Sequence, residues 1–232
     1  MRKHVIDDIR LEEDTGKGDP IRFTNQEFRK MFDLANLGRN DIFYDLGSGW
    51  GQSLIIALTE YGVKRAVGIE NDRERQMISR LRLTRRNLHP RALIVPGDFT
   101  DLYSGKLAGA SLEEPTVVFY GLSSDDLLID AMREKAKTGC RLIYYFNGLF
   151  PEIKAERVDF PFFVSTVPFE KPTSEYDWLS SILRKRKSSL GDEGKPTVDE
   201  LWDELTHDYD VYSDTSDIRY YKRRLREVLT KL

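Results

Sequence analysis

Apolar residues alternate along the chain between helical spacing and short continuous runs, from residue 24 to about residue 146. Thr24-Asn25-Gln26-Glu27 is a capping box that opens the first helical segment. The runs that favour buried strands are residues 42–46, 65–69, 92–96, 115–120 and 141–146, and amphipathic helices are expected between them. Such alternation predicts a parallel sheet covered by helices on both faces.

The segment after the fifth run favours a different kind of strand. Residues 160–169 are rich in strand-forming residues interrupted by prolines, which is typical of antiparallel edge strands. The prediction is therefore an α/β fold, doubly wound, with a mostly parallel seven-stranded sheet and an antiparallel edge hairpin. A second capping box at Thr197-Val198-Asp199-Glu200 predicts a short helical C-terminal extension. The expected organisation is an N-terminal arm over 1–23, a main domain over 24–170 and this extension over 171–232.

Composition narrows the classes of protein that the chain could represent. Cys140 is the single cysteine, and the three histidines stand far from any residue at ligand spacing, so we expect neither a disulfide nor a bound metal. No signal-peptide pattern and no apolar run of membrane-spanning length is present, which predicts a cytoplasmic protein without membrane contact. A monomer is favoured.

Charge is nearly balanced over the whole chain but not locally. The formal net charge is -3, which excludes a strong overall positive field for nucleic-acid binding. An arginine-rich segment from Arg73 to Arg86 is nevertheless expected to form one helix. Two interpretations stay open for it: a solvated helix face, or a surface that contacts RNA phosphates.

The most informative motif is the loop Asp45-Leu46-Gly47-Ser48-Gly49-Trp50-Gly51-Gln52, between a predicted strand and a predicted helix. Doubly wound sheets bind nucleotides at this place, where glycines let the backbone turn and a ligand approach closely. The dinucleotide fingerprint GxGxxG fits poorly, because the third glycine falls one position early and Gln52 occupies its place.

Acidic residues at successive strand ends indicate the charge of the ligand. Asp45 lies beneath the loop, where it would repel a pyrophosphate but attract the ammonium and sulfonium of S-adenosylmethionine. Glu70 ends the second strand and can accept hydrogen bonds from both ribose hydroxyls. Asp98, after the third strand, suits the adenine amine, and Phe99 can lie against the adenine ring. The row of acids favours a positively charged cofactor.

These residues, in this order and spacing, resemble the class I methyltransferases over about residues 20 to 146. The similarity is greatest to the non-SET histone lysine methyltransferases of the disruptor-of-telomeric-silencing family and to small archaeal protein-lysine methyltransferases. The resemblance implies S-adenosylmethionine as cofactor, with S-adenosylhomocysteine as product, and a position for Thr24 over the methionine end. The expected cofactor contacts are Thr24, Asp45, Gly47, Ser48, Gly49, Gly51, Gln52, Glu70, Asn71, Asp98, Phe99 and Tyr120.

The resemblance also implies N-methylation of a protein lysine, although Phe119-Tyr120-Gly121-Leu122-Ser123 stands where the histone enzymes carry an Asn-Asn-Phe type stretch. An apolar aromatic channel would favour the neutral amine. Tyr120 is expected to position the acceptor, in a substrate pocket formed by Tyr120, Gly121, Tyr145, Phe146 and Asn147. Core packing is an equally good interpretation of Tyr145 and Phe146.

Two other classes of function remain open from the sequence. One is methyl transfer to RNA or a small molecule; the other is a non-catalytic cofactor-binding or scaffold module. The Asn/Asp-Pro-Pro-Tyr/Phe stretch of amino-group nucleic-acid enzymes is absent after the fourth strand. Cys140 begins the fifth strand, where burial is expected, and not the place of a cytosine C5 nucleophile.

Overall fold

The structure is a computed structural model that describes residues 23–121, 126–145, 153–159 and 162–171, together with 197, 199, 200, 203, 222, 223 and 226. The helices are α1 (Asn25–Leu34), α2 (Gln52–Thr59), α3 (Arg73–Arg85), α4 (Thr100–Tyr103) and α5 (Asp126–Lys135). The strands are β1 (Ile42–Leu46), β2 (Arg65–Glu70), β3 (Ala92–Pro96), β4 (Val117–Tyr120), β5 (Arg141–Tyr145), β6 (Arg157–Asp159) and β7 (Phe162–Thr166).

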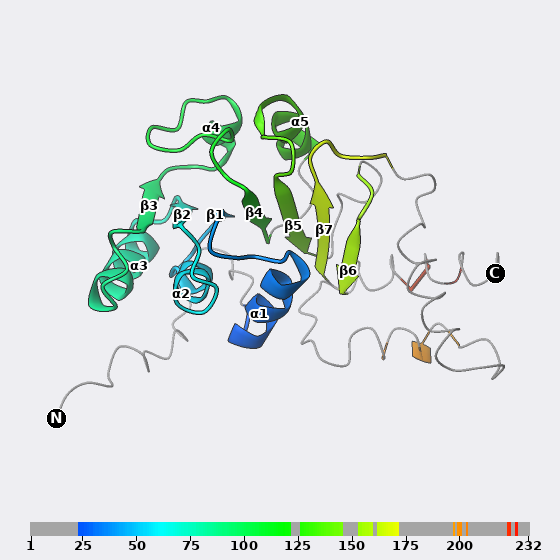
Figure 1. The fold of residues 1–232 in the computed structure, drawn as a ribbon, viewed down its shortest axis with the longest axis horizontal. Coiled ribbons are helices and arrows are strands. Elements are labelled where there is room, and N and C mark those ends of the chain that lie inside the picture. Colours follow the sequence, from blue (N-terminus) through cyan, green and yellow to red (C-terminus); the bar gives the residue numbers. More distant parts are fainter. Residues whose placement is uncertain are drawn as a thin grey trace.

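The strands form one seven-stranded sheet in the order β3-β2-β1-β4-β5-β7-β6 (Figure 1). β1 pairs in parallel with both β2 and β4, whereas β7 runs antiparallel to β5 and β6. The predicted mostly parallel sheet with an antiparallel edge hairpin is confirmed. Because Leu46 of β1 is in register with Ile69 of β2 and Tyr120 of β4, the carboxyl ends of these strands lie at one edge. That edge carries the glycine loop.

Helices cover both faces of the sheet, and each face has its own hydrophobic core (Figure 1). The α1–α2–α3 face buries apolar residues of these three helices against alternate strand residues such as Phe43 and Phe119. The α4–α5 face buries the other set, including Tyr44 and Tyr120. Alternate burial within one strand follows from the two-residue period of β structure.

α1 is fixed at both ends, and its position matters because it begins beside the glycine loop. Its capping box is formed: the Glu27 amide donates to Thr24 Oγ1 at 3.2 Å, and the Thr24 amide donates to Glu27 Oε2 at 2.6 Å. At its other end, Arg141 donates to the Ala35 and Asn36 carbonyls, and Arg157 donates to the Leu34 carbonyl at 2.8 Å. These cations satisfy carbonyls that a helix C-terminus leaves without partners.

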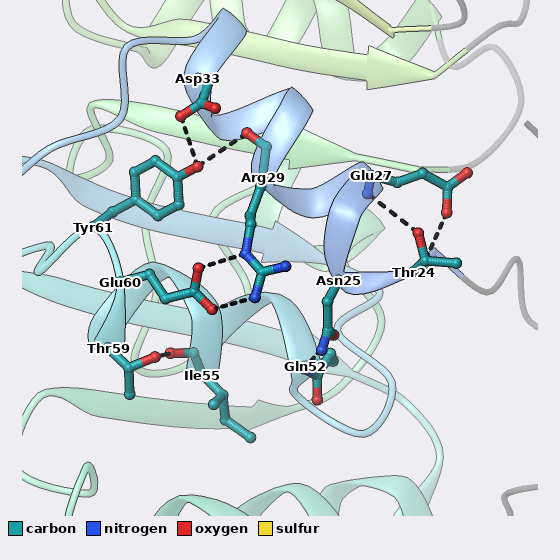
Figure 2. Close-up of polar contacts among 10 residues, drawn as sticks. All are labelled: Thr24, Asn25, Glu27, Arg29, Asp33, Gln52, Ile55, Thr59, Glu60 and Tyr61. Atoms are coloured by element: carbon teal, nitrogen blue, oxygen red, sulfur yellow. Dashed lines mark hydrogen bonds and ion pairs between the residues drawn. The ribbon is translucent and has the colours of Figure 1, made fainter. Parts of the chain in front are cut away.

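Side chains also tie α1 to α2, as Figure 2 shows. Arg29 forms a two-point ion pair with Glu60, at 2.6 and 2.9 Å. The Tyr61 hydroxyl donates to Asp33 Oδ1 at 2.7 Å and also lies 3.0 Å from the Arg29 carbonyl. The middle and last turns of α1 are therefore tied to the C-terminal end of α2.

Some element boundaries differ from those predicted. α4 was not predicted, because a four-residue helix is too short to show periodicity. β4 begins at Val117 instead of residue 115, which is a proline and has no backbone N–H to donate to a neighbouring strand. The second capping box is confirmed by the Glu200 amide, which donates to Thr197 Oγ1 at 3.2 Å. The N-terminal arm and most of the C-terminal extension lie outside the described residues.

Candidate active site

The glycine loop between β1 and α2 is held by hydrogen bonds within the protein. Gly47, Gly49 and Gly51 all have positive φ, at 97°, 51° and 73°, which explains why side chains are absent there. The amides of Gly47 and Ser48 both donate to the Ile69 carbonyl at 3.0 Å, and that of Gly51 donates to the Ser48 carbonyl at 2.8 Å. Phosphate-binding loops need such amides to point at the anion. In this loop three amides already donate to backbone carbonyls of the protein.

Glu70 occupies the end of β2 and closes the same loop. Its side chain is buried; Oε2 accepts the Gly49 amide at 2.7 Å and Oε1 accepts the Asp72 amide at 2.9 Å. A fourth loop amide is thus taken by a carboxylate, which further disfavours a phosphate ligand. Each oxygen still has a lone pair for another donor, such as a hydroxyl of a bound sugar.

Asp45 lies at the end of β1 and is 4% exposed. Its Oδ2 accepts a short hydrogen bond from the Ser53 hydroxyl of α2. Burial raises the pKa of Asp45 to about 7; the Ser53 hydrogen bond opposes this shift, whereas the negative charge of Glu70 adds to it. The two acids are therefore close enough to interact, as their strand ends predicted. A positive ligand beside them would favour ionised Asp45.

Asp98 and Phe99 follow β3 at the same edge. Asp98 is exposed, and its Oδ1 accepts hydrogen bonds from both the amide and the hydroxyl of Thr100 at 2.8 Å. Neither of these two bonds uses Oδ2. The Phe99 ring lies edge-on to the Tyr120 ring, with centroids 5.7 Å apart. The structure thus brings together the residues predicted for the adenine end and Tyr120 of β4.

The residues predicted for the acceptor pocket fall into two groups. Tyr120 packs on the α4–α5 face with Phe99, while Gly121 and Tyr145 meet on the other side at Phe23. A Cβ at Gly121 would lie 3.0 Å from both the Phe23 and the Phe119 rings, so a larger residue would have to displace these rings slightly. Phe146 and Asn147 lie outside the described residues.

Phe23 is a candidate site residue that the sequence analysis missed. Its ring centroid lies 5.1 Å from that of Tyr145, 5.6 Å from Phe119, 5.8 Å from Phe28 and 5.9 Å from Phe162. We call these five residues the aromatic cluster. A signal existed: Phe23 and Phe28 flank the capping box at the spacing of a hydrophobic staple. The staple places an aromatic ring beside the ends of β4 and β5.

Three arginines of α3 contact other parts of the protein. The Arg75 guanidinium lies 5.7 Å from the centre of the Trp50 ring, and Arg80 donates to the Ile94 carbonyl at 3.1 Å. Arg82 donates to the Trp50 carbonyl at 2.7 Å and to Gln52 Oε1. Arg80 is exposed, as expected for a solvated face, whereas Arg75 and Arg82 are half-buried against the loop.

The remaining sequence-based expectations concern single residues. Thr24 and Asn71 are exposed near the loop-bearing edge, in the first case as the N-cap of α1 and in the second directly after Glu70. Cys140 is buried, and burial raises the pKa of its thiol to about 12, which opposes a role as nucleophile.

Among the described residues, no three His, Cys, Asp or Glu side chains gather as a metal site. No helix in that part of the chain is long and apolar enough to cross a membrane.

Known proteins match both the sequence and the fold. The family model of the histone methylation protein DOT1 matches residues 23–87. A protein-lysine N-methyltransferase from Saccharolobus islandicus is 31% identical over 117 residues, which are 50% of this chain and 68% of that protein. An RNA methyltransferase from Salinibacter ruber, solved with S-adenosyl-L-homocysteine, has a TM-score of 0.56 at 24% identity, over 66% of this chain and 98% of that one.

The sheet order, the closed glycine loop and the acids behind it, taken with these matches, define a class I methyltransferase. The match to the Saccharolobus islandicus protein covers more than two thirds of that protein. The chain therefore belongs to the family of that protein-lysine N-methyltransferase, and the resemblance noted from the sequence is confirmed.

Proposed function

We propose that this protein binds S-adenosylmethionine and transfers its methyl group to lysine side chains of protein substrates. The observation that supports the cofactor best is the closed loop. Four loop amides, those of Gly47, Ser48, Gly49 and Gly51, donate to protein acceptors, and two carboxylates stand behind them. This arrangement suits a cation without phosphates.

Different residues along the edge of the sheet would contact different parts of the cofactor. Asp45 and the first turn of α1 would hold the ammonium end, Glu70 the ribose hydroxyls, and Asp98 with Phe99 the adenine. When bound, the cofactor supplies an electrophilic methyl group on its sulfonium. The protein's own task is to position an acceptor lone pair in line with that methyl group and to exclude water.

The acceptor side is assigned to the aromatic cluster and to Tyr120. Phe23 and Tyr145 are partly buried, whereas Phe28, Phe119 and Phe162 are buried. An apolar surface of this kind disfavours a lysine ammonium and so favours the neutral amine that can attack. Lysine specificity rests on this chemistry and on the Saccharolobus islandicus relative, whose name gives protein lysine as its acceptor.

Radiolabelled cofactor distinguishes the possible acceptors. The purified full-length protein, incubated with methyl-labelled S-adenosylmethionine and a cell extract, should label proteins, and the label should survive nuclease treatment but not protease. Mass spectrometry of the labelled band should locate methyl groups on lysine. Label confined to RNA or to small molecules would replace the proposed acceptor with another, and binding without any transfer would support a non-catalytic module.

Phe23→Ala tests the acceptor assignment separately from the cofactor. We expect the KM for a protein acceptor to rise about tenfold, because the Phe23 ring, which packs against four other rings, would no longer line the acceptor side. Phe23→Leu, which keeps an apolar side chain, should recover part of the loss. Affinity for S-adenosylhomocysteine, measured by calorimetry, should change less than the KM does. Equal losses in both would contradict a role for Phe23 on the acceptor side.

A further inference from the structure

Arg82 of α3 contacts the glycine loop where the loop becomes α2. Its guanidinium donates to the Trp50 carbonyl at 2.7 Å and to Gln52 Oε1, so that one planar group joins the last residues of the loop to the first residue of the helix. One turn earlier on α3, Ser79 touches the loop: a Cβ at Gly51 would lie 2.2 Å from Ser79 Oγ. The exit of the loop is thus packed directly against α3.

Gln52, which accepts the bond from Arg82, also contacts α1. Its Nε2 donates to Asn25 Oδ1 at 2.7 Å (Figure 2). An arginine side chain has only donors, so its bond to Gln52 fixes which end of the amide carries oxygen. That orientation in turn directs the NH₂ group toward Asn25, the first residue of α1. Arg82, Gln52 and Asn25 form a continuous chain of hydrogen bonds across the loop.

The chain of contacts ends beside the candidate acceptor side. Asn25 directly follows Thr24, the N-cap of α1, and Phe23, which lies in the aromatic cluster. The loop itself contains three glycines with positive φ, and glycine backbones are conformationally permissive without outside restraint. Hydrogen bonds described above hold the loop and the first turn of α1 separately, and the contacts from Arg82 through Gln52 to Asn25 join the two.

We propose that Arg82 is a positioning residue for this methyltransferase, which holds the cofactor loop and, through Gln52, the start of α1 in one arrangement. The inference rests on the proposed function, because it assigns the loop to the cofactor. It also gives the arginine-rich helix a role that its charge pattern did not indicate. Lysine cannot replace Arg82, because a single ammonium lacks the planar fork that reaches two acceptors.

Calorimetric binding of S-adenosylhomocysteine to three full-length variants tests the proposal. We expect the Kd to rise about tenfold in Arg82→Met, and nearly as much in Arg82→Lys, because charge alone does not restore the two hydrogen bonds. Arg85→Met is the matched control: Arg85 lies on the same helix, is exposed and has no hydrogen bond with another described residue. Its Kd should stay within about twofold of wild type.

A double variant separates positioning from general stability. If Arg82 acts through Gln52, the Kd of Arg82→Met combined with Gln52→Ala should rise by less than the product of the two single effects. Thermal unfolding of all variants without ligand checks that Arg82→Met remains folded. A wild-type Kd in Arg82→Met, full rescue by lysine, or effects that simply multiply would each overturn the inference while leaving the proposed function intact. Failure of the wild-type protein to bind S-adenosylhomocysteine would overturn both.

Discussion

Glu70→Gln should lower the affinity for S-adenosylhomocysteine about a hundredfold, which corresponds to a loss of about 3 kcal/mol. Glu70 accepts two backbone amides, one on each carboxylate oxygen: Gly49 at 2.7 Å and Asp72 at 2.9 Å. Glutamine has nearly the same shape but only one oxygen, so its NH₂ group must face one of these amides. The loop or the start of α3 would lose its partner, and the ribose hydroxyls would lose a charged acceptor.

Glu74→Gln provides the control. Like Glu70→Gln, it replaces one carboxylate by an amide, but Glu74 is exposed and lies in the first turn of α3. Its affinity should stay within about twofold of wild type, since exposed charges contribute little. Calorimetry on both variants at one pH and salt concentration gives the comparison. Equal affinities for Glu70→Gln and wild type would remove Glu70 from the cofactor site.

The fold was predictable because its signals are local and repeated. Each parallel strand is a short apolar run, and the capping boxes at Thr24 and Thr197 mark helix starts directly in the sequence. The order of the strands in the sheet cannot be read in the same way. That order, like the register of Leu46 with Ile69 and Tyr120, was available only from the structure.

The candidate site was predictable only as a set of residue types at strand ends. Sequence placed Asp45, Glu70 and Asp98 at one edge, but it could not show that Glu70 closes the loop by accepting the Gly49 amide. Contacts between segments far apart in the chain, such as Arg82 with Gln52, leave no periodic signal. Phe23 falls between these cases, because the staple spacing was visible but its aromatic partners were not.

The strength of S-adenosylhomocysteine binding should depend steeply on pH, and Asp45 should be the cause. Burial raises the pKa of Asp45 to about 7 in the free protein, so that below pH 7 most molecules carry a neutral carboxyl group. A ligand with an ammonium group binds the ionised form better, and binding must then release a proton. We expect the affinity to rise up to about tenfold per pH unit between about pH 5 and 7, and to level off above pH 7.

Asp45→Asn should abolish this pH dependence and lower the affinity, while it stabilises the free protein at alkaline pH. The sign follows from the raised pKa: the folded state binds a proton that the unfolded state has lost, so the contribution of Asp45 to stability is full below about pH 4 and is lost as the pH rises through about 7. At pH 8 the folded wild type must bury an ionised carboxylate, at a cost of a few kcal/mol, and asparagine avoids this cost. Urea unfolding at pH 5 and pH 8, with calorimetry at pH 6 in two buffers of different ionisation enthalpy, measures both effects. A wild-type affinity that does not change with pH, or an asparagine variant that is less stable at pH 8, would show that Asp45 is not the buried acid that receives the cation.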